Sequence, residues 1–461
     1  MFYRLNDAYA LRGWLHLTNA LLKRPENVVK PLTGSDFNLL LLCDGCTPME
    51  GLLTDATRAR LDKYVADGVV SPCETASPID ADQQYRFYRN RFVPGAHWAI
   101  TGRCNYRCRH CYMDAPSGQY GELSHEDAFG IIDQLSQCGV QQIELTGGEP
   151  FIRKDFWEIV DEIRRKKMVI RQVYTNAWLL NDTILDEFER RSMRPEFSVS
   201  FDGIGWHDWM RGVTGAEDAA WRAFELCKRR GFSVNVEMCL HTGNVSVVRE
   251  SLKKLGEAGV HAVKIGAIRP TPLWESRGEG RTISNEDYIE AAIDYIPHYC
   301  EDGKPLDLLW SGAVELNRSG TYQVAPERLC GDASCEKSLL CNSPRSVFHI
   351  TPEGRLLPCI ALTALEDQTM FPRIQDVGLQ SLLTSGSYID FATARIGDLL
   401  KVNTECAACE HKYVCGGGCR ASALLSGNGM MGCDPDQCAF FRADYSQRIH
   451  QIAQSAGLKR K

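Results

Sequence analysis

The sequence lacks the features of a nucleic-acid-binding, secreted or membrane protein. It has 52 Lys and Arg against 59 Asp and Glu, a net charge of -7, whereas phosphate binding requires a basic surface. No apolar run reaches the roughly 18 residues that a membrane span needs. The N-terminus has no basic region followed by an apolar core, so it does not resemble a secretory signal. We therefore expect a cytoplasmic protein with neither nucleic acid nor a membrane as a partner.

Cysteine, by contrast, is abundant. The chain has 20 cysteines among 461 residues, and a reducing compartment disfavours a disulfide framework of that size. Three lie within residues 104–111, and ten lie between Cys330 and Cys438. This clustering favours metal or iron–sulfur ligation. We interpret most of the seven scattered cysteines as small buried apolar side chains.

The distribution of apolar residues divides the chain into three parts. Residues 1–80 combine short strands with helices, as in a winged-helix-like module, and a polar linker follows. Residues 95–310 alternate six strands with amphipathic helices, which predicts a parallel α/β sheet. Six units, rather than eight, predict an open partial (β/α)6 barrel with active residues at the C-terminal ends of its strands. Residues 311–461 are rich in cysteine, glycine and proline, and bound metal would have to hold their fold.

The six strands expected in the middle part are short. Ser124 and Asp127 predict an N-terminal cap for the helix after the first of them. The expected strands cover residues 97–100, 141–146, 169–175, 196–201, 233–240 and 261–268.

A compact cysteine motif directly follows the first predicted strand. Cys104, Cys108 and Cys111 are spaced C-x3-C-x2-C. Three thiolates on one loop can ligate three irons of a cubane cluster. The fourth iron would then be open to a small molecule, as the open position of catalytic zinc is. The alternatives are a zinc loop and three cysteines that lie close together in the sequence by chance.

The motif and its surroundings resemble the radical S-adenosylmethionine (SAM) superfamily over residues 95–310. The resemblance implies that the three thiolates hold a [4Fe–4S] cluster that cleaves SAM. It places His110 against the adenine and the TGGEP turn at residues 146–150 beside the SAM amino group, because glycines allow close backbone approach. The implied SAM contacts are His110, Gly147, Gly148, Glu149, Asn176, Ser200, Asp202, Arg211 and Asn244.

Several of these contacts depend on the resemblance alone. Ser200 and Asp202 match ribose and carboxylate contacts, and Arg211 is a plausible partner for the SAM carboxylate. Ala177 follows Asn176 where the family often has glycine. For each of these positions the alternative is a strand-end cap or a turn residue.

The resemblance also implies a reaction. An electron from the reduced cluster breaks the sulfonium bond of SAM and yields methionine and a 5′-deoxyadenosyl radical, which abstracts a substrate hydrogen. The cofactor carries the difficult chemistry, while the protein positions it and excludes water. Reduction implies a donor such as flavodoxin or ferredoxin as a partner.

The C-terminal cysteines follow a longer pattern, which includes C-x2-C-x5-C-x3-C at residues 406–419. Alone, eight such cysteines would also fit two structural zinc sites. Beside the first motif they resemble the SPASM domain, which binds two auxiliary [4Fe–4S] clusters, so that the chain would hold three [4Fe–4S] clusters. The implied ligands are Cys335, Cys341, Cys359 and Cys419 for the first auxiliary cluster and Cys406, Cys409, Cys415 and Cys438 for the second.

Two cysteines exceed the SPASM pattern. Cys330 precedes Cys335 by five positions, so the first ligand assignment can shift. The sequence leaves open whether the first auxiliary cluster keeps an open iron. Cys433 is a core residue, a spare thiol or a hydrogen donor.

Residues 1–80 resemble the RiPP recognition element, a winged-helix domain related to the PqqD chaperone. The resemblance implies that a leader peptide binds as an added strand at an exposed sheet edge. The alternatives are a structural or dimerising appendage and a DNA-binding winged helix. The acidity of the chain and the mixed charge of residues 55–68 disfavour DNA.

Together the three parts predict a radical SAM oxidoreductase that matures a ribosomally made precursor peptide. The expected product is a thioether or another carbon-linked cross-link. Alternatives are a peptide epimerase, with Cys239 or Cys433 as hydrogen donor, a formylglycine-type sulfatase maturase, and a non-catalytic electron-transfer or binding protein. The sequence identifies no general base, and Glu237, Lys264 and Arg269 are candidate polar groups near the barrel mouth.

Overall fold

The largest sheet contains, at its centre, the six parallel strands that the sequence predicts. They are β7 (Gly95–Ala99), β8 (Gln142–Thr146), β9 (Val169–Thr175), β10 (Glu196–Ser200), β11 (Val234–Leu240) and β12 (Ala262–Ala267). Each strand pairs in parallel with the next one along the chain. This computed structural model describes residues 1–461 except 16, 25–27, 92–94, 269–270, 329–330 and 366. Arg269 and Cys330 lie outside the described residues.

The six strands are the centre of a wider open sheet. Among the described residues it has 12 strands, in the order β17-β16-β7-β8-β9-β10-β11-β12-β13-β14-β15-β18. The added strands are β13 (Asp307–Trp310), β14 (Val314–Asn317), β15 (Thr321–Val324), β16 (Val347–Ile350), β17 (Leu356–Leu357) and β18 (Lys459–Arg460). The parallel pairing of β16 with β7 joins the cysteine-rich part directly to the first strand of the parallel set.

Amphipathic helices cover the outer face of this sheet. In α3 the buried residues Ala128, Ile131, Ile132 and Leu135 follow the helical period. Ser124 Oγ accepts the Asp127 N–H at 3.1 Å, which confirms the predicted cap. The helices of this part of the chain, including α6 with the cavity-lining Arg211, are α3 (His125–Gln137), α4 (Phe156–Arg165), α5 (Asp182–Arg190), α6 (His207–Arg211), α7 (Ala216–Arg230), α8 (Val248–Glu257), α9 (Pro272–Arg277) and α10 (Asn285–Glu301).

The alternation within β11 shows how the sheet separates core from cavity. Val234, Val236, Met238 and Leu240 are buried in the main apolar core, whereas the intervening side chains are partly accessible. Because successive residues of a strand point to opposite faces, the intervening Asn235, Glu237 and Cys239 lie on the inner face. The polar inner face is where the functional site forms.

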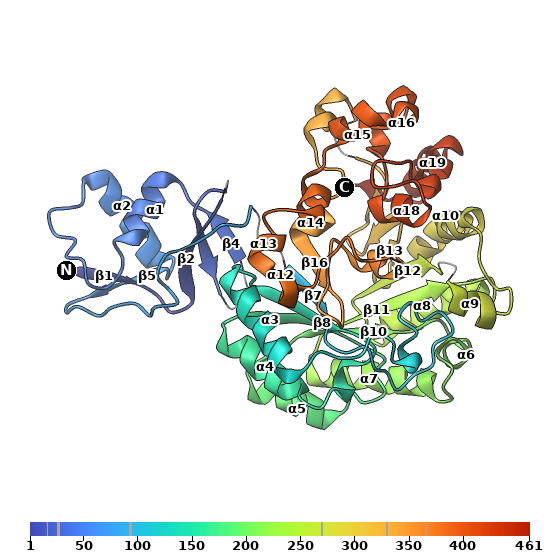
Figure 1. Cartoon of the computed structure of the whole chain (residues 1–461), viewed down its shortest axis with the longest axis horizontal. Helices are drawn as coiled ribbons and strands as arrows, with labels where there is room; N and C mark the ends of the chain where they lie inside the picture. Colours follow the sequence, from blue (N-terminus) through green and yellow to red (C-terminus); the bar gives the residue numbers. More distant parts are fainter. Residues whose placement is uncertain (16, 25–27, 92–94, 269–270, 329–330, 366) are drawn as a thin grey trace.

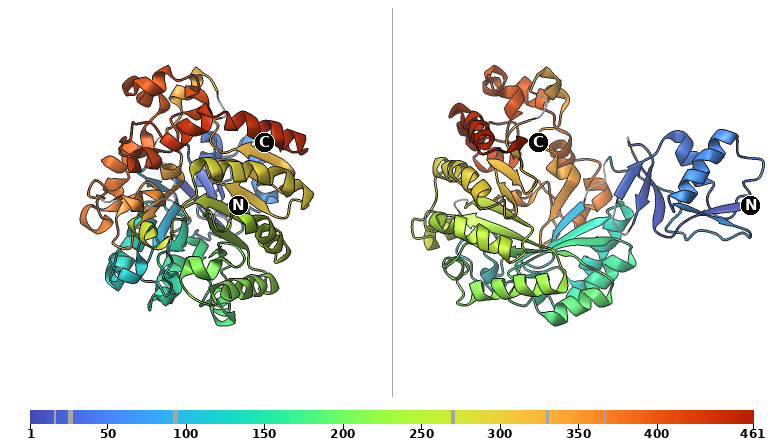
Figure 2. Two further views of the ribbon diagram at one scale, coloured as in Figure 1. Left: turned by 90° about the vertical axis from the view of Figure 1, so that its right-hand side faces the viewer. Right: turned by 180° about the vertical axis from the view of Figure 1, so that it is seen from behind.

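The cysteine-rich part consists of short helices and packs on the α/β body (Figures 1 and 2). Its helix α20 (Tyr445–Ser455) packs against α10. Its other helices are α11 (Ser343–Ser346), α12 (Ile374–Val377), α13 (Leu379–Leu382), α14 (Ser387–Thr393), α15 (Ile396–Val402), α16 (Thr404–Ala408), α17 (Lys412–Cys415), α18 (Arg420–Leu425) and α19 (Pro435–Arg442).

The N-terminal unit stands beside the body, in blue in Figures 1 and 2. It contains β1 (Phe2–Leu5), β2 (Tyr9–Trp14), β3 (Ala20–Lys23), β4 (Val28–Pro31), α1 (Gly34–Leu41), α2 (Asp55–Ala66), β5 (Val70–Cys73) and β6 (Arg86–Tyr88). Its larger sheet has the order β4-β3-β2-β6, so β4 is an edge strand.

One expectation for this unit is wrong. The sequence predicts that the segment after residue 80 is a polar linker. Within that segment, however, residues Arg86–Tyr88 form the strand β6, which pairs with β2. The reason is Tyr88, whose buried ring packs against Trp14 with ring centroids 5.8 Å apart.

Within the described ranges, no helix combines the length and apolarity that crossing a membrane requires.

Candidate active site

Cys104, Cys108 and Cys111 lie on the loop after β7 and line a cavity of about 300 Å³. We call this the central cavity. Six of the predicted SAM contacts also line it, and they come from the C-terminal ends of the parallel strands and the loops after them. These six are His110, Gly147, Gly148, Asn176, Ser200 and Arg211. The structure thus gathers the cysteine motif and most of the predicted contacts around one space.

The two glycines of the TGGEP turn are required by close packing against the cysteine loop. A Cβ atom at Gly147 would lie 2.4 Å from Thr101 O, and one at Gly148 would lie 2.0 Å from Arg103 O. Gly147 also has a φ of +146°, which favours glycine. The Gly148 N–H donates to Thr101 O at 2.9 Å. Glycine therefore lets the turn after β8 and the cysteine loop share one wall of the cavity.

Glu149 lies behind this wall and does not line the central cavity. Its buried carboxyl accepts hydrogen bonds from the Asn176 N–H at 2.8 Å and from Thr175 Oγ1 at 3.0 Å. Burial raises the pKa of Glu149 to about 7. Glu149 therefore holds the end of β9, where Asn176 faces the cavity.

Asn176 links the end of β9 to the cysteine loop. Its Nδ2 donates to Asn105 Oδ1 at 2.7 Å and lies 3.8 Å from Cys104 Sγ. Ala177, at the usual glycine position, has a φ of +65°. The tight turn is thus kept without glycine, at some backbone strain.

Asp202 is fully buried and forms a network instead of facing the cavity. Its Oδ2 accepts from Arg211 Nε at 2.7 Å, and its Oδ1 accepts from the Cys239 N–H at 3.0 Å. Although burial acts to raise it, the pKa of Asp202 is held well below its usual range by the Arg211 charge and the His207 hydrogen bond. Arg211 Nη1 lies 3.8 Å from Cys108 Sγ. The carboxylate thus orients a cation toward the cysteine motif.

Asn244 is also buried behind the cavity. Its Nδ2 donates to Asp202 O at 2.8 Å and to Cys239 O at 2.9 Å. It therefore fastens the end of β10 to the end of β11. Glu149, Asp202 and Asn244 position the cavity wall, whereas the other six predicted contacts form its surface.

His110 presents an uncompensated polar atom at the cavity. Among the described residues, its buried Nδ1 has no hydrogen-bond partner. Burial, and then the Arg211 charge, lower the pKa of His110 to about 4. Ligand atoms of His110, Asp202 and Cys239 lie within 4.8 Å of one another. A neutral imidazole with a free nitrogen suits hydrogen bonding to a bound polar heterocycle.

Several cavity residues lack a sequence motif. His97, Tyr174 and Ile360 line the cavity beside the thiols. His97 Nδ1 lies 3.0 Å from His349 Nδ1 on the paired strand β16. The alternation of side chains in β7 and β9 could have placed His97 and Tyr174 on the inner face, but nothing in the local sequence indicates Ile360.

Two candidate polar residues, Glu237 and Lys264, face each other inside the cavity. Lys264 Nζ lies 3.1 Å from a Glu237 carboxylate oxygen, and the two residues are register partners on β11 and β12. Cys239 lines the same space, whereas Cys433 lies in a different pocket. Only Cys239 of the two candidate hydrogen donors is therefore near the cysteine motif.

Three thiols of the first auxiliary set lie together. Cys341 and Cys359 pack against one apolar cluster that includes Leu357 and Leu362. Burial raises the pKa of the Cys359 thiol to about 11, and the neighbouring thiols of Cys419 and Cys341 add to the rise. The three thiols therefore influence one another electrostatically.

Cys335, the fourth implied ligand, packs in a different cluster with Leu340 and Leu399. It is disulfide-bonded in this structure. A ligand cysteine must be a free thiolate. Cys335 would therefore join the first auxiliary set only after reduction.

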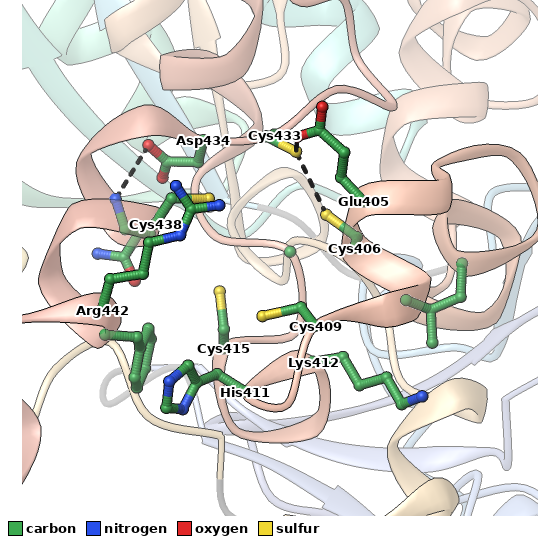
Figure 3. A pocket seen from close by; sticks show the side chains of 14 residues that line it. Glu405, Cys406, Cys409, His411, Lys412, Cys415, Cys433, Asp434, Cys438 and Arg442 are labelled. Carbon is green, nitrogen blue, oxygen red and sulfur yellow. Dashed lines mark hydrogen bonds between the residues drawn. The ribbon is translucent and has the colours of Figure 1, made fainter. Parts of the chain in front are cut away.

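The second auxiliary set surrounds its own pocket, the auxiliary pocket shown in Figure 3. Cys406, Cys409, Cys415 and Cys438 all line it. The chain then passes through Gly416, Gly417 and Gly418, whose φ angles are +60°, +89° and +74°. Three successive left-handed residues explain the CGGGC sequence.

Asp434 connects the two auxiliary sets. Its buried carboxylate caps the start of α19, which carries Cys438, by accepting the Asp436 and Gln437 N–H groups. The same carboxylate accepts the Cys419 N–H at 2.7 Å. One side chain thus holds the backbone at a ligand of each set.

The donor sets fit the cofactors that the sequence implies. Thiolates suit iron–sulfur clusters, and the three-thiol loop opens onto a cavity that the Arg211 cation and His110 also line. A parallel α/β sheet with these groups at its strand ends defines an enzyme that uses a metal cluster beside a small bound molecule.

Comparisons with known proteins identify the family. A model described as the radical SAM superfamily matches residues 98–255. Pre-heme d1 synthase of Dinoroseobacter shibae is 30% identical over 362 residues, which cover 74% of this chain and 84% of that protein. PqqA peptide cyclase of Gluconobacter oxydans is 24% identical over 363 residues, which cover 77% of this chain and 92% of that protein. This chain belongs to the radical SAM superfamily.

The family binds SAM and a [4Fe–4S] cluster, and this chain is an enzyme that uses SAM. A solved structure shares its fold: that of Streptococcus suis SuiB bound to the precursor peptide SuiA. The two have a TM-score of 0.63 and 14% sequence identity, with 95% of this chain and 100% of SuiB covered.

Proposed function

We propose that this enzyme modifies a ribosomally synthesised precursor peptide and installs a thioether or another carbon-linked cross-link. When bound, SAM and the cluster at Cys104, Cys108 and Cys111 supply a 5′-deoxyadenosyl radical that abstracts a substrate hydrogen atom. The name of the relative PqqA peptide cyclase supports a peptide substrate. A second relative, pre-heme d1 synthase, carries the name of a heme-forming enzyme. The names of the relatives therefore do not determine the substrate, and the site provides the main support for a peptide.

The observation that carries the proposal is the position of Ile360. It directly follows Cys359 of the first auxiliary set, and it lines the central cavity. A substrate in that cavity would lie between the cysteine motif and the auxiliary thiols. Forming a cross-link after hydrogen abstraction requires removal of a second electron and a proton. Cysteines beside the cavity would provide the ligands of an electron acceptor, or a site for a substrate thiolate.

Different residues of the central cavity would bind SAM and the substrate. Arg211, held by Asp202, presents a cation to the carboxylate of SAM. Gly147 and Gly148 bring the backbone close to the SAM amino group, and Asn176 and Ser200 offer polar groups for the ribose. The Glu237–Lys264 pair would then face the substrate, where it can bind a polar group of the peptide or take up a proton.

We further propose two auxiliary [4Fe–4S] clusters, which make three in the chain. Cys341, Cys359 and Cys419, with Cys335 once reduced, would hold the first, and Cys406, Cys409, Cys415 and Cys438 would hold the second. Flavodoxin or ferredoxin would deliver electrons. Iron and sulfide content after anaerobic reconstitution tests this count, and two bound zinc ions in place of iron would contradict it.

The N-terminal unit is proposed to bind the leader of the peptide. On its edge strand β4, Val28 is 53% exposed, and Lys30 is exposed as well. A peptide strand could add there through its backbone, as in other edge-strand recognition. Deleting residues 1–90, which removes β6 together with its partner β2, should abolish leader binding and leave slow SAM cleavage intact. Unchanged peptide affinity would support a structural or dimerising role instead.

Cys239 favours one alternative, a peptide epimerase. Its thiol lines the central cavity, and burial, followed by the Asp202 charge, raises its pKa to about 12. A thiol that stays protonated could return a hydrogen atom to the substrate radical. Cys239→Ala would then abolish product formation, whereas a cross-linking enzyme would retain most of its activity.

The decisive experiment uses, as a candidate precursor, any short cysteine- or aromatic-rich peptide that is encoded beside this gene. Reconstituted enzyme, SAM and dithionite are incubated with that peptide, and the products are analysed by mass spectrometry. A cross-link lowers the peptide mass by two hydrogen atoms. Epimerisation leaves the mass unchanged but incorporates deuterium from heavy water. Absence of 5′-deoxyadenosine would contradict every catalytic form of the proposal.

A further inference from the structure

The auxiliary pocket contains a fifth thiol. Cys433 lines the pocket together with the four implied ligands, and its Sγ lies 3.6 Å from Cys406 Sγ (Figure 3). The ligand pattern of the family leaves Cys433 unused. Its place beside Cys406 needs an explanation because the segments that carry the two thiols are 27 residues apart.

The position of Cys433 is built into the fold by hydrogen bonds on both sides. Asn403 Nδ2 donates to Met431 O at 3.0 Å and lies 3.6 Å from Cys433 Sγ, and Asn403 Oδ1 accepts the Cys406 N–H at 2.9 Å. One side chain therefore holds both cysteine segments. Asn428 Nδ2 donates to Cys433 O at 2.9 Å.

A buried cation fixes the loop that leads to Cys433. Arg420 is 1% exposed, and its Nη1 donates to Met430 O and to Gly432 O, both at 2.8 Å. Gly432 fits closely, because a Cβ atom there would lie 2.1 Å from Asn428 O. The loop is therefore shaped to bring Cys433 to the pocket, which makes a chance surface thiol a poor explanation.

The short distance between the two thiols restricts their roles. Cysteines on different irons of a cubane must be separated by the width of the cluster, and sulfurs in contact cannot satisfy that condition. Cys406 and Cys433 therefore reach the same corner of a cluster whose other corners belong to Cys409, Cys415 and Cys438. The Glu405 carboxylate, 3.5 Å from Cys433 Sγ, accepts a hydrogen bond from that thiol.

We propose that Cys433 and Cys406 are interchangeable ligands of one iron at the second auxiliary site. The exchange forms one iron–thiolate bond as the other breaks, and the proton of the incoming thiol passes to the departing thiolate, so no electron is gained or lost. The proposal rests on the presence of a cluster in this pocket, as proposed above. It adds that this cluster survives the loss of either thiol.

Single and double substitutions in the full-length chain test the exchange. Cys406→Ala and Cys433→Ala should each keep the iron and sulfide content of the unmodified protein. Cys409→Ala is the matched control, because Cys409 lines the same pocket but has no such hydrogen bond to a second thiol in the described structure. It should lose the iron of one cluster, and Cys406→Ala/Cys433→Ala should lose as much. Iron is measured by chemical analysis and Mössbauer spectroscopy after anaerobic reconstitution, and circular dichroism checks folding.

The possible outcomes separate this inference from the proposed cluster. If Cys406→Ala loses as much iron as Cys409→Ala while remaining folded, the exchange is excluded and the cluster is retained. If neither Cys406→Ala nor Cys409→Ala loses iron, the auxiliary pocket holds no cluster. The proposed second auxiliary cluster and the proposed ligand exchange then both fail. If Cys406→Ala unfolds, Cys406→Ser provides the same comparison. Retention of iron in Cys406→Ala with its loss in the double variant would establish the exchange.

Discussion

Arg211 and Asp202 form a buried ion pair in which Nε donates to Oδ2 at 2.7 Å. The carboxylate is fully buried, and the guanidinium reaches both the central cavity and the thiol of Cys108. A buried cation requires such a partner, because an unpaired charge in an apolar environment is costly. The pair therefore belongs both to the fold and to the wall of the central cavity, where SAM is proposed to bind.

Removing the carboxylate should damage stability and catalysis together. In Asp202→Ala the guanidinium is left buried and unpaired, and breaking such a pair costs about 3–5 kcal/mol of unfolding free energy. We expect the formation of 5′-deoxyadenosine to fall at least about tenfold, in line with an unfavourable change of about 1.4 kcal/mol or more. Chemical denaturation and product analysis measure the two effects.

The control for this change is Glu250→Ala. Glu250 pairs with Lys254 on the surface of α8, where both side chains are at least half exposed. Exposed pairs contribute about 0–1 kcal/mol. An Asp202→Ala variant as stable and active as Glu250→Ala would contradict the assigned role.

The cysteine motif should be needed for every turnover. Cys104→Ala removes one of three thiolates, and we expect neither its cluster nor 5′-deoxyadenosine to form. Cys46→Ala is the control, because Cys46 is exposed and lies in the N-terminal unit. Iron content relative to the unmodified protein and chromatography of the nucleoside give the readouts. Persistent SAM cleavage in Cys104→Ala would place the reactive cluster elsewhere.

The Glu237–Lys264 pair should separate SAM cleavage from peptide modification. It lines the cavity from strands β11 and β12, whereas the three thiols lie on the loop after β7. In Lys264→Met we expect SAM cleavage without peptide to continue, while modified peptide falls at least about tenfold because a substrate-facing charge is lost. Lys254→Met, on the surface, should change neither rate. Equal loss of both activities would instead assign Lys264 to SAM binding.

The buried pair His97–His349 should make stability sensitive to acid. Burial lowers the pKa of His349 to about 3, and burial also holds the pKa of His97 well below its usual range. Below pH 6.5 the unfolded chain binds protons that the folded chain excludes, so stability falls as the pH falls from about 6.5 toward 3. The slope is about 1.4 kcal/mol per pH unit for each histidine.

Replacing one of these histidines tests that slope. The unfolding free energy of His349→Phe should depend less steeply on pH between 6.5 and 4 than that of the unmodified protein. The comparison is made by denaturant titration at several pH values, and a surface substitution such as His125→Phe serves as the control because His125 is half exposed. Identical slopes for the two variants would show that His349 does not titrate on unfolding.

The sequence predicts best what local spacing determines. The six strands follow from their apolar runs. C-x3-C-x2-C identifies one group of thiols, and the first three cysteines of C-x2-C-x5-C-x3-C identify another, because nearby residues on one loop must lie together. The TGGEP motif is equally short, and the resemblance to the family predicts its place in the site. These features needed no knowledge of tertiary packing.

Local sequence spacing could not predict contacts between segments that are distant in the chain. Motif position could not distinguish Gly148, which faces the cavity, from Glu149, which is buried behind it to hold Asn176. Cys433 lies against Cys406 only because Asn403 and Arg420 shape the intervening chain. The disulfide-bonded state of Cys335 likewise has no signature in its spacing.

Asp434 has a consequence for how the protein matures. Its carboxylate holds the backbone of Cys419 while it starts the helix that carries Cys438. Filling one auxiliary site with metal would thus order a ligand segment of the other. Loading of one auxiliary site would then favour loading of the other, so a preparation short of iron should contain fewer chains with one filled auxiliary site than independent filling would give.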